Sequence, residues 1–126
     1  VYYIQYAHAR ICAILAKLGS ERVSSALGVD ATWTGEDLQA AERDLAMKLL
    51  ALPGEISEAA ERRAPHRIAN YALELAQQFS AFYRDCKVVG AEPVGSESFR
   101  IAISAATRDV LALVLGLLGV SAPEHM

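Results

Sequence analysis

The sequence predicts an all-α fold, a compact antiparallel bundle of about five helices in a single domain that spans residues 1–126. A chain of 126 residues with 53% hydrophobic and 21% charged residues is long enough to bury one core and too apolar to be disordered. Apolar residues recur at steps of three and four along most of the chain, which is the period of an amphipathic helix. The only competing strand signal is the brief pair Val88 and Val89.

Glycines set the expected ends of the first two helices. The first helix is predicted over residues 2–18 and ends at Gly19, because glycine readily adopts the left-handed conformation that often follows a helix. Ser20 is expected to cap a short second helix, which continues to Leu27 and stops at Gly28.

A loop over residues 28–35, with Trp33 as a hydrophobic plug, is expected to lead into a third helix. Thr34, followed three residues later by Asp37, predicts the start of this helix, which runs to about Ala51. Its buried stripe is expected to comprise Leu38, Ala41, Leu45, Leu49 and Leu52.

Pro53 suits the first turn of a short exposed helix over residues 55–63. The two longest helices follow this short helix and are expected to pair with each other. Both long segments carry apolar residues at alternating steps of four and three, the seam of near-antiparallel bundle helices. The seams run over residues 68–86 and 99–117. They comprise Ile68, Ala72, Leu75, Phe79, Phe82 and Cys86 in one helix, and Phe99, Ile103, Ala106, Val110, Leu113 and Leu117 in the other.

The net charge of −3 is unevenly distributed. Residues 36–61 hold seven acids and two bases, a balance of −5, whereas each flanking segment carries one excess positive charge. This pattern favours a modest, shape-dependent RNA contact over non-specific binding of polyanions. Cys12 and Cys86 are expected to be buried thiols of a reducing cytoplasm. The longest apolar run, residues 110–120, is too short to span a bilayer, so we expect a soluble cytoplasmic domain without a membrane partner.

Tyr3, Tyr6, Arg10 and Lys17 share one strip of the first helix, beside its apolar face. Two phenols and two cations on one strip suit contact with an unstacked base and the phosphate next to it. The alternative interpretation is that the rings cover a neighbouring helix as amphipathic side chains. His8, at the edge of the apolar face, is interpreted as a structural histidine.

A second cluster repeats this chemistry on the segment 68–86. Tyr83 lies one position off the apolar seam, and Arg84 and Lys87 lie together on one side of the same helix. If the two helices are adjacent, both strips face one RNA-binding groove. The alternative for Tyr83 is packing at the rim of the core, with its hydroxyl group reaching solvent.

Catalytic and metal-binding patterns are absent from the sequence. There is no serine–histidine–aspartate set and no glycine-rich phosphate loop, and His8, His66 and His125 show no metal-ligand spacing. We therefore expect no catalytic residue and no metal site.

Three blocks of the chain are YYIQYAHARICAIL near the amino end, LELAQQFSAFYRDCKVVG, and LLGVSAPEHM at the carboxyl end. In this order, and over the whole chain, they resemble the DALR domain, the anticodon-binding domain of arginyl-tRNA synthetases. The resemblance implies the helical bundle of class I aminoacyl-tRNA synthetase anticodon-binding domains. It also implies a function, which is to grip the anticodon arm of arginine tRNA and hold unstacked loop bases with aromatic and polar groups.

The resemblance also nominates individual residues for tRNA contact. The tyrosines would contact loop bases, the two cations would contact phosphates or base edges, and the last residue with its carboxylate would fold back towards the same pocket. The nominated residues are Tyr3, Tyr6, Arg10, Tyr83, Lys87 and Met126. His125 stands where the family commonly has an arginine.

The family's catalytic motifs, of the HIGH and KMSK kinds, are absent from these residues. The resemblance therefore implies a fragment that begins at a domain boundary, while the missing catalytic domain of the parent arginine–tRNA ligase binds ATP and arginine. We expect the chain alone to be inactive, monomeric and without a cofactor, with arginine tRNA and the catalytic domain as partners and no DNA partner. The alternative interpretation is a helical protein-interaction or dimerisation module that does not bind RNA.

Overall fold

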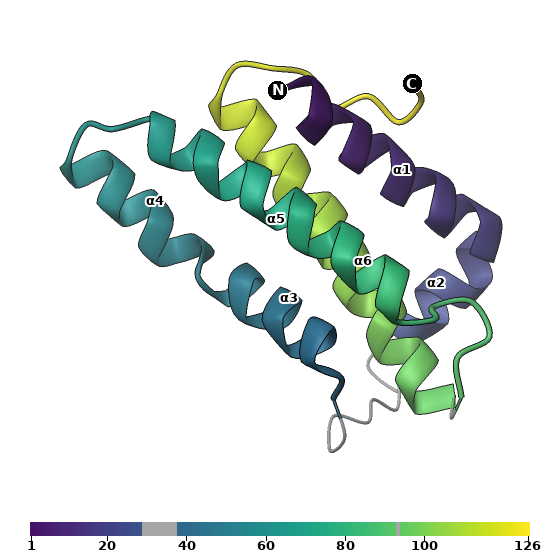
Figure 1. Cartoon of the computed structure of the whole chain (residues 1–126). Helices are drawn as coiled ribbons and strands as arrows, with labels where there is room; N and C mark the ends of the chain where they lie inside the picture. Colours follow the sequence, from purple (N-terminus) through teal and green to yellow (C-terminus); the bar gives the residue numbers. More distant parts are fainter. Residues whose placement is uncertain (29–37, 93) are drawn as a thin grey trace.

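Two long helices form the centre of the molecule, and the other helices cover them on two sides (Figure 1). The computed structural model describes residues 1–28, 38–92 and 94–126. Its elements are α1 (Tyr2–Leu18), α2 (Ser20–Leu27), α3 (Ala40–Leu50), α4 (Leu52–Glu61), α5 (His66–Asp85) and α6 (Val94–Leu117). The central pair, α5 and α6, is antiparallel; α1 packs against both on one side and α3 against both on the other. The predicted all-α bundle is confirmed, with six helices in the described residues.

The first two helices have the predicted bounds. Gly19 separates them with a φ of 89°, a left-handed conformation that glycine adopts without steric cost. The expectation for Ser20 is wrong, because it is the first residue of α2 and no side chain caps this helix. Gly19 itself occupies the capping position.

The third helix begins later than predicted. Trp33 and Thr34 lie outside the described residues, but Leu38 and Gln39 are not helical and α3 starts at Ala40. The reason is a different capping interaction, in which the carboxylate of Glu42 accepts a hydrogen bond of 2.9 Å from the backbone N–H of Gln39. The next helix, α4, carries the predicted proline in its first turn.

The predicted seam of α5 is confirmed, since all six of its residues are buried. The predicted seam of α6 is wrong over its second half. Leu113 is 48% exposed, Leu117 is also exposed and Val110 is only half-buried. The helix instead buries Ile101, Ala105, Leu111, Val114 and Leu115. Because α6 contacts α1, α2, α3 and α5, apolar residues lie on several of its sides, and one repeat of three and four could not identify the most buried side.

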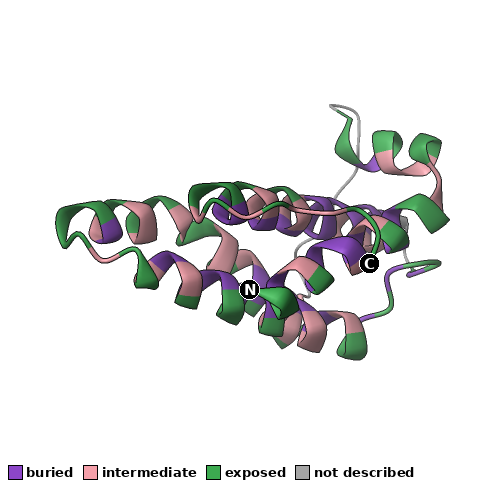
Figure 2. Ribbon diagram, turned by 90° about the horizontal axis from the view of Figure 1, so that it is seen from above, coloured by how far each residue is buried: buried purple, intermediate pink, exposed green. Residues whose placement is uncertain are grey.

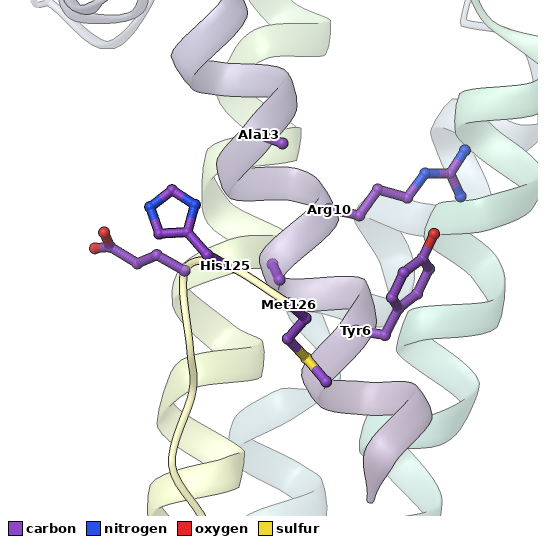
Figure 3. A pocket seen from close by; sticks show the side chains of 7 residues that line it. Tyr6, Arg10, Ala13, His125 and Met126 are labelled. Atoms are coloured by element: carbon purple, nitrogen blue, oxygen red, sulfur yellow. The ribbon is translucent and has the colours of Figure 1, made fainter.

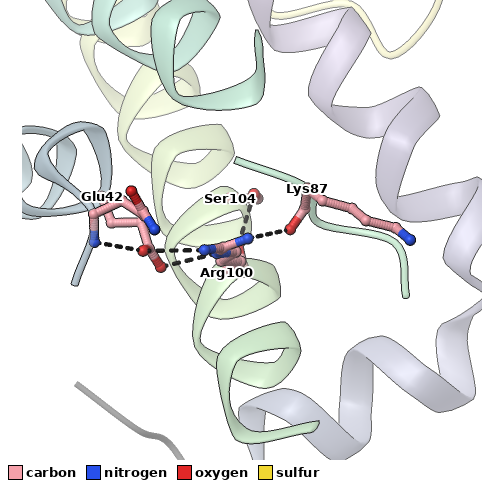
Figure 4. Close-up of polar contacts among 5 residues, drawn as sticks. Glu42, Lys87, Arg100 and Ser104 are labelled. Carbon is pink, nitrogen blue, oxygen red and sulfur yellow. Dashed lines mark hydrogen bonds and ion pairs between the residues drawn. The ribbon is translucent and has the colours of Figure 1, made fainter. Parts of the chain in front are cut away.

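Two ion pairs fasten α6 to its neighbours. The guanidinium of Arg100 donates to both carboxylate oxygens of Glu42 on α3, at 3.0 and 3.2 Å, and to the carbonyl oxygen of Lys87 at 2.6 Å (Figure 4). Arg22 on α2 donates to Glu97 at 2.6 Å. Buried residues gather on the facing sides of the helices, as Figure 2 shows. Within the described ranges, no helix has both the length and the apolar character needed to cross a membrane.

Candidate functional site

A cleft of about 270 Å³ opens on the outward face of α1, beside the carboxyl-terminal segment of the chain (Figure 3). Successive lining positions on α1 are three, one and three residues apart, so they share a face of the helix. The cleft is lined by Tyr6, Ala9, Arg10 and Ala13 from α1 and by Glu124, His125 and Met126. Two parts of the chain that are more than 100 residues apart in sequence therefore form opposite walls. Three of the six nominated residues, Tyr6, Arg10 and Met126, lie in this cleft.

Arg10 connects the cleft to an aromatic stack on α5. Its guanidinium carbon lies 5.1 Å from the ring centroid of Tyr83, within the range of a cation–π contact. The Tyr83 ring stacks in turn on the ring of Phe79, with a centroid distance of 6.0 Å and an interplanar angle of 13°. Phe79 is fully buried, so the stack runs from the core to the edge of the cleft. Among the described residues Arg10 has no carboxylate partner, and its charge is available to an anion.

The other three nominated residues do not line the cleft. Tyr83 lies beneath Arg10. Tyr3 joins α1 to α5, because its hydroxyl group is 3.2 Å from Oγ of Ser80. Lys87 follows the end of α5, where its carbonyl oxygen is bound by Arg100 and its exposed side chain extends away from that contact (Figure 4).

The carboxyl-terminal wall of the cleft is held by two residues of α1 that the sequence did not nominate. Gln5 donates a hydrogen bond from Nε2 to the carbonyl oxygen of Ser121, and Nδ1 of His8 donates to the carbonyl oxygen of Pro123, both at 2.9 Å. His8 is 5% exposed, which confirms its interpretation as a structural histidine. Its partner could not be inferred, because it lies 115 residues away in sequence. The one feature of the sequence that pointed to a special role for His8 was its position as a polar residue between two alanines, Ala7 and Ala9.

The groups that line the cleft can stack, form hydrogen bonds and form ion pairs. Both cysteines are free, and burial raises the pKa of the Cys12 and Cys86 thiols, so they stay protonated and weakly nucleophilic at neutral pH. In the part of the chain that the structure describes, no group of three acidic, histidine or cysteine residues is arranged to hold a metal ion. The cleft presents a half-exposed phenol, a guanidinium, an imidazole and a thioether, together with the carboxylate of Glu124. Its volume lies just below the roughly 300–1,000 Å³ typical of small-molecule pockets, which suits a single planar group.

Comparison with known proteins identifies relatives over the whole length of the chain. Residues 4–126 match the family described as the DALR anticodon binding domain. The arginine–tRNA ligase of Desulfitobacterium hafniense (strain DSM 10664 / DCB-2) is 43% identical over 127 residues, and that of Desulforudis audaxviator is 47% identical over 130 residues. Each match covers 100% of this chain and 22% of the relative, so the chain spans about a fifth of the length of these curated relatives.

Solved structures show the same relationship. The arginyl-tRNA synthetase of Thermus thermophilus superposes with a TM-score of 0.81 and 34% identity, covering 98% of this chain and 21% of that protein. A putative arginyl-tRNA synthetase from Campylobacter jejuni superposes with a TM-score of 0.84 and 30% identity, covering 99% of this chain and 26% of that protein.

Proposed function

Because the chain belongs to the DALR anticodon-binding domain family, we propose that it recognises the anticodon arm of arginine tRNA as part of an arginyl-tRNA synthetase. The observation that carries this proposal is the extent of the family match, residues 4–126, which includes both walls of the cleft. The parent reaction is the ATP-dependent ligation of arginine to its tRNA.

The chemistry of the cleft suits an unstacked nucleotide. Tyr6 offers a half-exposed ring on which a base stacks, a contact that contributes about 1–3 kcal/mol per base. Arg10 offers a guanidinium that binds a phosphate or a base edge, and the ring of Tyr83 holds that guanidinium in place. The side chain of Met126 lies across the cleft from Tyr6 and limits the space for the base (Figure 3).

The residues of this chain indicate which functions of the parent enzyme it would supply and which would belong to other parts of that enzyme. None of its side chains forms a nucleotide-binding motif, so ATP and arginine would bind to another part of the enzyme. The chain would supply tRNA affinity and identity. We expect it to be inactive in ATP–pyrophosphate exchange and aminoacylation when it is tested alone.

A comparison of two RNAs tests the proposal. Binding of the 126-residue chain is measured to an arginine tRNA transcript and to the same transcript with an altered anticodon. We expect the altered anticodon to weaken binding at least about fivefold, because each lost base contact contributes about 1–3 kcal/mol. Equal affinity for both transcripts would exclude anticodon recognition. Absence of RNA binding, together with a salt-insensitive protein complex, would indicate a protein-interaction module.

A further inference from the structure

The last residues of the chain have few attachments to the bundle. The final backbone hydrogen bond that closes α6 joins the N–H of Val120 to the carbonyl oxygen of Leu115 at 2.9 Å. Beyond it, the segment 121–126 contains no helix, and most of its residues are exposed. Among the described residues, its hydrogen bonds to the bundle are the two donated by Gln5 and His8. Ala122 adds apolar packing against the core. The position of this segment therefore depends largely on two side chains of α1.

The environment of His8 makes its hydrogen bond important for the docked position. The imidazole is buried, and Nδ1 must carry a hydrogen because the carbonyl oxygen of Pro123 can only accept. If the segment left, this N–H would lose its carbonyl acceptor and keep only a weak contact with Sγ of Cys12 at 3.9 Å, which is unfavourable. Gln5, three residues earlier, lies on the same side of the helix and binds the segment two residues upstream of Pro123. Ala9 lines the cleft together with the docked segment and is only 6% exposed, so this part of α1 is largely covered.

We propose that Gln5 and His8 are positioning residues for RNA recognition. They hold residues 121–126 across α1, so that Glu124, His125 and Met126 form the second wall of the cleft. This inference rests on the proposed function, because the wall serves a bound base. The two side chains contact no RNA themselves. Their effect on affinity passes entirely through the carboxyl-terminal segment.

The first experiment compares two replacements of the imidazole. His8→Phe retains a ring but removes the donor, whereas His8→Asn offers an amide N–H near the position of Nδ1. Backbone ¹⁵N relaxation reports the order of residues 121–126, and titration with arginine tRNA reports affinity. We expect His8→Phe to lower the order parameters of the segment from about 0.85 to below about 0.6 and to weaken binding roughly five- to tenfold. His8→Asn should restore both properties towards those of the unmodified chain.

A second experiment separates positioning from general destabilisation. In a chain that ends at Val120 the wall is absent, so His8→Phe should change RNA affinity by less than about twofold. Tyr6→Ala should weaken binding in both the full and the shortened chain, because Tyr6 acts on RNA directly. If His8→Phe weakens binding equally in both chains, it acts through the fold and the proposal is wrong.

The remaining outcomes are also decisive. If His8→Phe leaves the segment ordered, the two side chains do not hold it and the proposal fails. A mobile segment with unchanged RNA affinity would show that the second wall does not contribute to binding. An unmodified chain without affinity for arginine tRNA would overturn the proposed function, and the positioning role with it. The relaxation measurement would still decide whether His8 holds the segment.

Discussion

The tyrosines of the candidate site differ in their exposure and in their packing contacts with the rest of the fold. Tyr6 is 49% exposed and lines the cleft. Tyr83 is half-buried, stacked on Phe79 and covered by Arg10. Of the two interpretations of the tyrosine strip, RNA contact therefore suits Tyr6 best, whereas Tyr83 and Tyr3 also serve packing between α1 and α5. A substitution of Tyr83 would change stability and binding together, so Tyr6 provides the cleaner test.

Tyr6→Ala is expected to weaken binding of arginine tRNA roughly ten- to a hundredfold, the loss of one base–aromatic stack. The melting temperature should change little, because an exposed ring contributes little to the core. Tyr2→Ala is the matched control, since Tyr2 is exposed on the same helix but does not line the cleft. Fluorescence titration and thermal unfolding of both variants measure the two effects. Equal RNA affinity of the two variants would exclude Tyr6 from the interface.

Tyr71 predicts a specific loss of stability at alkaline pH. Burial raises the pKa of its phenol to about 12, and its hydroxyl group donates to the carbonyl oxygen of Lys48 at 2.7 Å. The folded state thus binds the proton more tightly than the unfolded state, whose phenol has a pKa of about 10. Its stabilisation is complete below pH 10 and is lost as the pH rises towards 12. Urea unfolding should show a larger loss of stability between pH 9 and pH 11 for the unmodified chain than for Tyr71→Phe. Equal losses would contradict the raised pKa.

Among the elements, α6 shows how burial depends on neighbours. Leu111 is fully buried, whereas Leu113, two residues later, faces solvent. Leu111→Asp would bury an unpaired charge and should unfold the domain, while Leu113→Asp should leave the melting temperature within a few degrees of the unmodified value. Circular dichroism melting of the pair makes this comparison. A folded Leu111→Asp variant with an unfolded Leu113→Asp variant would mean that the seam inferred from the repeat was right.

A buried ion pair between Glu42 and Arg100 joins α3 to α6. Glu42 is only 3% exposed, and it binds both Arg100 and the backbone N–H of Gln39. Glu42→Ala leaves the Arg100 guanidinium without its carboxylate partner in a largely buried site and should cost about 3–5 kcal/mol. Glu74→Ala removes a longer ion pair, 3.6 Å from Lys48, whose carboxylate is exposed, and should cost no more than about 1 kcal/mol. Urea unfolding gives both values, and similar costs would show that burial adds nothing to the Glu42 pair.

The sequence predicted the elements best where local chemistry determines them. Gly19 and Gly28 end α1 and α2 at the positions that their local sequence predicts. The apolar stripe of α5 is narrow enough to identify the buried face of that helix. The start of α3 was placed too early, because the sequence offers an acidic residue at Asp37 as well as at Glu42. It is Glu42 that accepts the hydrogen bond from the N–H of Gln39 and pairs with the distant Arg100. The face of α6 depends on four neighbouring helices, which no local pattern specifies.

At the scale of the whole molecule, the site combines local and distant information. The strip of α1 was visible as a pattern, and the blocks that resemble the family nominated the residues at the other end of the chain. The segment 121–126 docks through the backbone carbonyl groups of Ser121 and Pro123. Backbone acceptors carry no sequence signal, which is why the roles of Gln5 and His8 required the folded structure.

The charge of the whole molecule determines how its RNA binding should respond to salt. A net charge of −3 opposes general attraction to polyanions, so affinity must come from a few local cations and from stacking. We therefore expect a shallow dependence of binding on salt, with about 0.7 released counterions for each phosphate contacted on a single-stranded loop. Lys87 is exposed, has no carboxylate partner among the described residues and was nominated by the family resemblance, so we expect it to make such a contact outside the cleft.

Lys87→Ala should weaken tRNA binding modestly and lower the slope of log K against log salt concentration by about 0.7–1. Arg43→Ala is the control, since Arg43 is an exposed cation on α3, which lies on the other side of α5 from α1. Its removal should leave the slope unchanged. Titrations at 50, 100 and 200 mM salt measure both slopes. If the two variants share one slope, Lys87 makes no phosphate contact, and the RNA-binding surface ends at the cleft formed by Tyr6, Arg10 and the carboxyl-terminal segment.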